Sequence, residues 1–167
     1  ETVQSQLSAG FNQYAPMTGA QPLRERISEL MQNCYQVQYH PDTEITITAG
    51  ATQGIYTSIA AFINQGDEVV VFEPAYDCYI PAIQVHGGVV KPIALEYPNF
   101  KINWQVVKNT ITDKTKMIMI NSPHNPSGTT LEASDLMELE KIVSGTNIIV
   151  VSDEVYEHMV FDGKAHQ

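Results

Sequence analysis

The chain has 167 residues, of which 43% are hydrophobic, and no linker-like tract divides it, so we expect one well-packed domain. Its formal charge of -10 comes from 19 acidic and 9 basic side chains. This acidic excess argues against nucleic acid and against an anionic membrane surface as partners, because both carry negative charge. It does not exclude a small anionic ligand, which local backbone N–H groups can hold.

The two cysteines, Cys34 and Cys78, match neither a disulfide-rich scaffold nor a metal-binding CxxC pair, so we expect reduced core residues in a cytoplasmic protein. Residues 1–10 lack the basic start and apolar run of a signal peptide, and no apolar stretch approaches the roughly 20 residues that span a bilayer. The chain begins without methionine and stops at residue 167 without a helix cap or polar tail. We expect it to be a piece of a longer soluble protein.

The first predicted element is an amphipathic helix over residues 23–37, where apolar side chains recur at helical spacing with charged side chains between them. The apolar positions are Leu23, Ile27, Leu30, Met31 and Cys34, and the charged ones are Arg24, Glu25, Arg26 and Glu29.

Beyond this helix, β-branched apolar runs alternate with helical patterns. Strands are predicted at residues 44–48, 68–72, 88–95, 116–121 and 147–152, and helices at 52–63, 76–85 and 132–143, with an irregular stretch around Trp104 and Val107. Continuous apolar runs such as 69–72 and 148–151 suit strands that are covered on both faces. The sequence therefore predicts an α/β fold with a mostly parallel sheet flanked by helices. Such sheets bind ligands beyond the carboxyl ends of their strands.

The turn at residues 49–54 leads from a predicted strand into a helix and is a candidate phosphate cradle. Its small residues let the backbone approach a ligand, and the Thr52 hydroxyl can add a hydrogen bond. The turn has neither the Gly-Lys-Ser/Thr ending of a Walker A loop nor a GxGxxG pattern, so NTP or NAD binding does not follow. Taken alone, it is better explained by a glycine that serves packing.

Asp153 directly follows the last predicted strand, where its carboxylate can form a charge-assisted hydrogen bond to a protonated ring nitrogen. Tyr156 lies three residues later, so one helical turn would bring its phenol near the same ligand as a donor to a ring oxygen. The alternative for Asp153 is a helix N-cap.

Asn125 lies in a stretch, residues 121–128, whose two prolines and glycine fix the backbone, which suits a positioned amide but also an ordinary turn residue. His124 has no partners at metal-ligand spacing, so we interpret it as structural and predict no metal site. Tyr76 can lay its ring on a planar ligand or pack in the core. We expect these turns to converge at one edge of the sheet.

Taken together, the turns resemble the class I and II aminotransferases of the fold type I enzymes that use pyridoxal 5'-phosphate (PLP), specifically the kynurenine, glutamine and methionine aminotransferase branch. The resemblance covers nearly the whole chain. The motifs occur in family order: Phe11-Asn12-Gln13-Tyr14, Gly19 with Pro22-Leu23-Arg24, the Gly50 turn, Gly66-Asp67-Glu68-Val69, Glu73-Pro74-Ala75-Tyr76-Asp77-Cys78-Tyr79, Asn121-Ser122-Pro123-His124-Asn125-Pro126-Ser127-Gly128 and Ser152-Asp153-Glu154-Val155-Tyr156.

This resemblance implies a set of cofactor-binding residues and a homodimer with shared active sites. The set comprises Ala51, Thr52 and Gln53 for the phosphate, Tyr76 for stacking on the ring, Asp153 for the ring nitrogen, Asn125 and Tyr156 for the phenolic oxygen, and Tyr14 for the phosphate of a neighbouring subunit. Asp153, Tyr156 and Asn125 are also the implied catalytic residues, with Asn125 near the substrate carboxylate. The implied substrates are an amino acid and a 2-keto acid.

The chain departs from the family pattern because the lysine that carries the cofactor is expected beyond Tyr156, after a Ser-containing motif. Lys164 is the only lysine after Asp153 and lacks that context, so we interpret it as a solvated surface residue. The phosphate-binding and carboxylate-binding arginines of the family are also missing. We expect residues 1–167 to be a partial PLP-binding large domain, without the small C-terminal domain, that does not transaminate by itself.

Three functions remain open at this stage. The first is transamination of a hydrophobic, aromatic or sulfur-containing amino acid of the methionine type, which Tyr76 and Asp77-Cys78-Tyr79 favour weakly. The second is a PLP-dependent carbon–sulfur β-lyase, which shares the same ring-binding residues. The third is a non-catalytic binding module that kept the ring pocket.

Overall fold

The structure is a computed structural model that describes residues 2–163 and 165–167. Lys164, interpreted above as a solvated surface residue, lies outside the described residues. The chain divides into two compact units, Glu1–Gly50 and Ala51–Gln167. Within the described residues, no helix is both long and apolar enough to cross a membrane.

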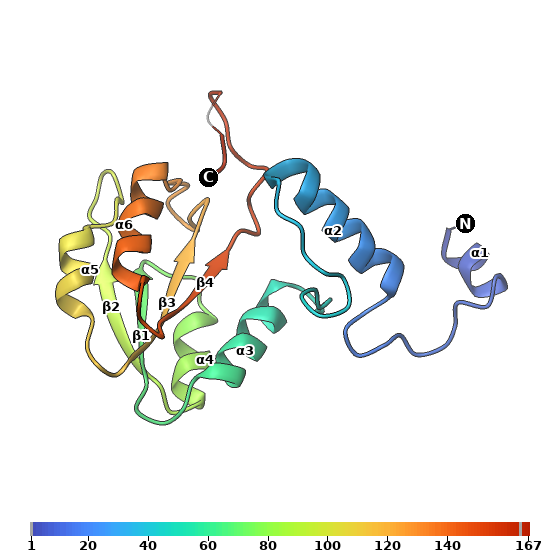
Figure 1. Ribbon diagram of the computed structural model, residues 1–167, viewed down its shortest axis with the longest axis horizontal. Helices are drawn as coiled ribbons and strands as arrows, with labels where there is room; N and C mark the ends of the chain where they lie inside the picture. Colours follow the sequence, from blue (N-terminus) through green and yellow to red (C-terminus); the bar gives the residue numbers. More distant parts are fainter. Residues whose placement is uncertain (1, 164) are drawn as a thin grey trace. The chain divides into compact units, whose positions relative to one another are not determined.

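The first unit contains the helices α1 (Thr2–Ser8) and α2 (Gln21–Tyr35) (Figure 1). The predicted helix is confirmed as α2, but its burial differs from a simple amphipathic pattern. Arg24 is buried, whereas Leu23 and Leu30 are 49% and 44% exposed. Arg24 is buried because its guanidinium has three partners. It donates to the carbonyl oxygens of Gly19 and Pro41. It also forms a salt bridge with the Asp42 carboxylate, at 3.1 Å.

The prediction of a strand at residues 44–48 is wrong. Residues 45–48 have no regular secondary structure, and within this unit the backbone N–H of Ile47 donates to the carbonyl of Thr18 at 2.9 Å. Ile47 instead packs so closely on Gly19 that a Cβ there would lie 2.4 Å from Ile47 Cγ1. A β-branched run forms a strand only where a neighbouring strand supplies hydrogen-bond partners. In the described residues of this unit, the segment that lies beside residues 45–48 is a loop and not a strand.

The second unit is built on a four-stranded sheet in which every pairing is parallel (Figure 1). Its strands are β1 (Glu68–Glu73), β2 (Val89–Ala94), β3 (Thr115–Asn121) and β4 (Ile149–Asp153), in the order β2-β1-β3-β4. All four carboxyl ends therefore lie at the same edge. The central strands β1 and β3 are almost fully buried, whereas β4 is only half-buried because it is the last strand of the sheet. The predicted α/β fold is confirmed.

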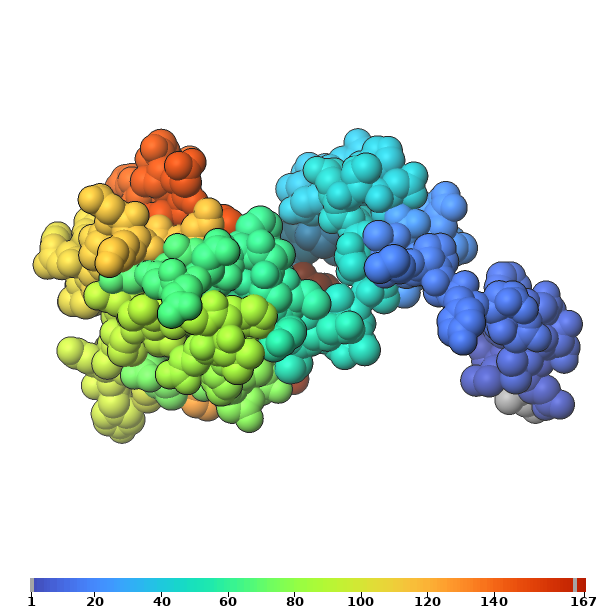
Figure 2. All heavy atoms as spheres, turned by 90° about the horizontal axis from the view of Figure 1, so that it is seen from below, coloured from blue at the N-terminus to red at the C-terminus, as the bar shows by residue number. Residues whose placement is uncertain are grey.

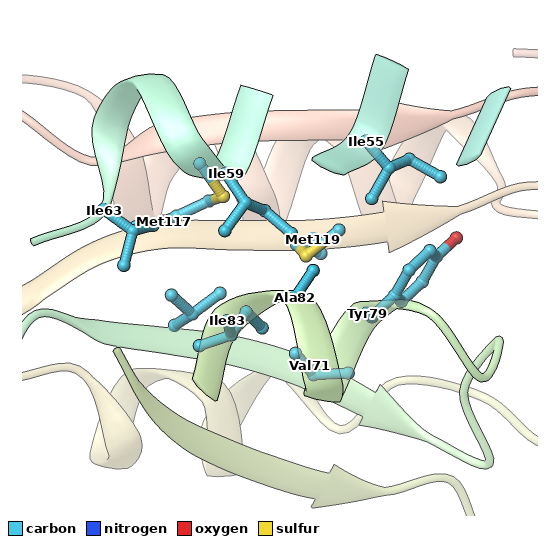
Figure 3. Packing of buried hydrophobic residues seen from close by; sticks show 10 residues of the cluster. Ile55, Ile59, Ile63, Val71, Tyr79, Ala82, Ile83, Met117 and Met119 are labelled. Atoms are coloured by element: carbon cyan, nitrogen blue, oxygen red, sulfur yellow. The ribbon is translucent and has the colours of Figure 1, made fainter. Parts of the chain in front are cut away.

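Helices cover both faces of this sheet, as its apolar strands require. On one face, α3 (Ala51–Phe62) and α4 (Tyr79–Val85) bury an apolar cluster against β1 and β3 (Figure 3). On the other face, α5 (Trp104–Thr110) and α6 (Ala133–Val143) border a second cluster. In Figure 2 the atoms of α3 and α4, coloured green and yellow-green, lie on the surface that faces the viewer.

Two helices differ from the sequence predictions. The helix predicted at 76–85 begins at Tyr79, so Tyr76 lies in the turn before it. α5 forms in the stretch predicted as irregular, because the Asn103 side chain caps it by accepting hydrogen bonds from the backbone N–H groups of Gln105 and Val106.

Candidate functional site

The carboxyl ends of β3 and β4, together with the turns around them, form a pocket of about 230 Å³ within the second unit. The last residues of the two strands, Asn121 and Asp153, are direct neighbours in the sheet. The lining residues are Ala51, Thr52, Ile55, Tyr76, Asn121, Asn125, Asp153, Val155 and Tyr156. The structure therefore brings together Thr52, Tyr76, Asn125, Asp153 and Tyr156, which the sequence placed in separate turns.

Two of the predicted cofactor residues do not line this pocket. Gln53 lies in the first turn of α3 but is not among the lining residues. Tyr14 belongs to the first unit, where its side chain is fully exposed.

The amino terminus of α3 brings hydrogen-bond donors to the pocket. The first amides of a helix have no partner within the helix, and the helix dipole adds partial positive charge there. Ala51 and Thr52 occupy this first turn and line the pocket. The Thr52 hydroxyl lies 3.5 Å from the Tyr76 hydroxyl, so both side chains present polar atoms at the same place.

Asp153 is the last residue of β4, and its half-buried carboxylate has a partner on each oxygen. Oδ2 accepts a hydrogen bond of 2.5 Å from the Tyr79 hydroxyl, and Oδ1 accepts a longer one of 3.3 Å from the backbone N–H of Val155. Burial, and then the hydrogen bond to Asp153, raise the pKa of Tyr79, so the phenol stays protonated and acts as the donor.

The segment after Asp153 is a turn and not a helix. The N–H of Glu157 donates to the carbonyl of Glu154 at 2.9 Å, and the half-buried Tyr156 lies within this turn. The helix N-cap interpretation of Asp153 is therefore wrong, because no helix follows it in the part of the chain that the structure describes. The turn still brings Tyr156 to the same pocket.

Asn121 connects the Asn125 loop to β4, and the sequence analysis missed this role. Its side-chain oxygen accepts a 2.7 Å hydrogen bond from the backbone N–H of Asn125, and its Nδ2 donates at 2.8 Å to the backbone carbonyl of Asp153. The available signal was its position, an asparagine at the very end of a strand and the start of a proline-rich loop.

His124 supports this loop without lining the pocket. Its buried ring places Nδ1 2.7 Å from the Ser127 hydroxyl, and its backbone N–H donates to the carbonyl of Thr129 at 2.8 Å. Burial lowers the pKa of His124, which favours the neutral ring. The described residues contain one grouping of possible metal ligands, Glu154, Glu157 and His166, which is empty. In it, His166 Nε2 lies 3.0 Å from a carboxylate oxygen of Glu154.

Comparison with known proteins identifies the family of this chain. Residues 1–167 match the family of class I and II aminotransferases. The chain is 43% identical to methionine aminotransferase of Escherichia coli over 99% of its own length and 43% of that protein. It is 35% identical to kynurenine–oxoglutarate transaminase of Dictyostelium discoideum, over 94% of this chain and 40% of that one. A crystal structure from Escherichia coli, described as having a methionine aminotransferase function, matches with a TM-score of 0.96 at 43% identity, over 99% of this chain and 44% of that one.

The fold is thus that of the fold type I aminotransferases, and the chain belongs to the class I and II aminotransferases, an enzyme family that depends on PLP. The resemblance stated from the motifs is confirmed, including its methionine and kynurenine aminotransferase relatives. The chain spans less than half the length of these relatives.

Proposed function

We propose that the pocket holds PLP and that the full-length protein transaminates a hydrophobic, aromatic or sulfur-containing amino acid of the methionine type with a 2-keto acid. The observation that carries this proposal is that Thr52, Tyr76, Asn125, Asp153 and Tyr156, from four separate turns, line one pocket. The 43% identity to a methionine aminotransferase supports the substrate class.

The residues present fit the chemical groups of PLP. The amino terminus of α3, with Thr52, offers donors for a phosphate, and the exposed ring of Tyr76 offers a flat apolar surface. Asp153 offers a half-buried carboxylate to a protonated ring nitrogen, and Asn125 and Tyr156 offer donors to a ring oxygen.

When bound, PLP supplies an electron sink for negative charge that develops on the amino acid. The contribution of Asp153 is to keep the ring nitrogen positively charged, because a carboxylate stabilises a neighbouring cation most strongly where water is partly excluded. Asn125 and Tyr156 orient the ring, and the first turn of α3 anchors its phosphate. We assign Gln53 to phosphate binding only because of the family resemblance, since it does not line the pocket.

The test is to add PLP to the full-length protein, record the visible absorption band, and then add amino acids one at a time with a keto acid acceptor. We expect methionine-type and aromatic amino acids to shift the band and yield keto acids. Asp153→Asn should lower turnover by roughly a hundredfold or more, as removal of one preorganised electrostatic contact does in other enzymes. The matched control Asp113→Asn changes an exposed aspartate outside the pocket and should leave turnover unchanged.

Full turnover in Asp153→Asn, or the absence of any band in the presence of the intact protein and PLP, would contradict the proposal. The β-lyase alternative is not favoured, because the relatives described above are aminotransferases. It predicts release of pyruvate from cystathionine without a keto acid. A non-catalytic binding module would bind PLP and turn over neither substrate.

We also propose a homodimer in which Tyr14 reaches the phosphate of the neighbouring subunit; its full exposure within this chain is compatible with such a role. Mixing inactive Tyr14→Ala and Asp153→Ala proteins after subunit exchange tests this. If the site is shared, about a quarter of wild-type activity should return, because half of the dimers are mixed and each then holds one intact site. No recovery in verified mixed dimers would place Tyr14 and Asp153 in the same subunit's site.

The cytoplasmic location remains part of the proposal. Cys34 and Cys78 are both free of disulfides, which suits a reducing compartment. Cell fractionation with an antibody to the protein tests it.

A further inference from the structure

The Tyr79 hydroxyl is a polar group placed at the end of an apolar cluster. Tyr79 is only 3% exposed and packs with residues of α3, α4, β1 and β3. Figure 3 shows its ring at the end of the cluster nearest the strand tips, with the hydroxyl directed away from the other side chains. Phenylalanine would fill the same apolar space, and a buried hydroxyl adds little stability unless it has a partner.

That partner is the Asp153 carboxylate. The 2.5 Å hydrogen bond joins residues 74 positions apart, from the start of α4 to the end of β4. The Tyr79 ring also meets the Tyr76 ring edge to face, with centroids 6.0 Å apart. Tyr79 therefore contacts two residues that line the pocket without lining it itself.

These contacts define the orientation of the carboxylate. Tyr79 holds Oδ2, the backbone N–H of Val155 holds Oδ1 less tightly, and each oxygen has a second lone pair for another donor. A carboxylate held by a short hydrogen bond from a buried, rigid side chain loses little freedom when a ligand binds.

We propose that Tyr79 is a positioning residue. Its hydroxyl fixes the Asp153 carboxylate in the orientation in which it accepts a hydrogen bond from the protonated ring nitrogen of PLP. This inference rests on the proposed function, because it assigns Tyr79 a role in the contact between Asp153 and the cofactor. It predicts that loss of the hydroxyl weakens recognition of the ring nitrogen and leaves recognition of the rest of the cofactor intact.

The experiment compares two cofactors on the full-length apoprotein by equilibrium binding: PLP itself, and the carbocyclic analogue in which a C–H group replaces the ring nitrogen. The two share the aldehyde, the phosphate and the phenolic oxygen, so the ratio of their affinities reports the contact to the ring nitrogen. We expect wild type to prefer PLP, and Tyr79→Phe to reduce that preference by about tenfold with unchanged affinity for the analogue. The matched control Tyr97→Phe removes the hydroxyl of a tyrosine that is 84% exposed and should keep the wild-type preference.

The outcomes separate the inference from the proposed function. If the wild-type protein bound the two cofactors equally, the role proposed for Asp153 would be wrong, and so would the role proposed for Tyr79. A wild-type preference that Tyr79→Phe retains in full would overturn the inference alone. So would an equal loss of affinity for both cofactors, since that is the signature of a merely structural change. If Tyr79→Phe does not fold, 3-fluorotyrosine introduced at position 79 alters the donor strength with nearly the same ring, and an unaltered preference there would also overturn the inference.

Discussion

Asn121 acts at the scale of single hydrogen bonds, because one side chain holds two parts of the candidate site. It accepts from the backbone of Asn125 and donates to the backbone of Asp153. Neither bond involves the side chains that we propose to bind the cofactor. Asn121 therefore lines the pocket and also sets the positions of two of its neighbours there.

Replacing Asn121 with alanine should destabilise the protein by about 1–3 kcal/mol, because the half-buried backbone N–H of Asn125 loses its acceptor. The carbonyl of Asp153 loses one of its two donors and keeps the backbone N–H of Ser122, at 3.1 Å. The substitution should also weaken PLP binding, since Asn125 and Asp153 are no longer held together. Thermal unfolding and cofactor titration measure the two effects. The control Asn109→Ala, at an exposed position of α5, should change neither. Wild-type stability in Asn121→Ala would show that water replaces both bonds without loss.

At the scale of elements, Asp135 joins the start of α6 to α5. One carboxylate oxygen accepts from the backbone N–H of Glu132 at 2.9 Å, and the other from the indole N–H of Trp104, also at 2.9 Å. The first bond satisfies an N–H group at the helix start, and the second fixes the position of an aromatic side chain packed on the core.

Asp135→Ala should therefore lower the free energy of unfolding by about 1–2 kcal/mol, the usual range for loss of a helix cap. The reason is that both the helix start and the Trp104 indole lose their acceptor. Urea denaturation followed by tryptophan fluorescence measures the change, because the chain has one tryptophan. Glu140→Ala, an exposed acidic residue of the same helix, should have almost no effect. Equal unfolding midpoints for the two variants would contradict this role of Asp135.

At the scale of the whole molecule, buried His124 links the stability of the fold to pH. Burial lowers the pKa of His124 below its ordinary value of 6.5. The unfolded chain therefore binds a proton at this residue before the folded chain does, so its contribution to stability is complete above about pH 6.5 and is lost as the pH falls through the folded pKa.

We expect the free energy of unfolding to decrease between about pH 7 and about pH 5, and this decrease to be smaller in His124→Gln. Urea titrations at a series of pH values provide the comparison. His158→Gln, at an exposed histidine, should keep the wild-type slope. An identical slope in His124→Gln would assign the pH dependence to other groups.

The sequence by itself determined the α/β class, the parallel sheet and the turns that carry the candidate site. These features are local: apolar periodicity, glycine and proline positions and motif order depend on residues close together in the chain. The isolated segment 44–48 shows the limit of such reasoning, since its β-branched residues favour a strand but the described part of its unit offers no strand to pair with it.

Only the tertiary structure decided which residues support the site. The partners of Asp153 lie 74 and 32 positions away, at Tyr79 and Asn121, and no local pattern relates them. The burial of Arg24 depends in the same way on contacts with other segments, because its partners are Gly19, Pro41 and Asp42. Tyr76 lies in the turn before α4, where its hydroxyl is near that of Thr52. Hydrogen-bond partners and burial depend on which surfaces meet in space, and that information arises only when the elements pack.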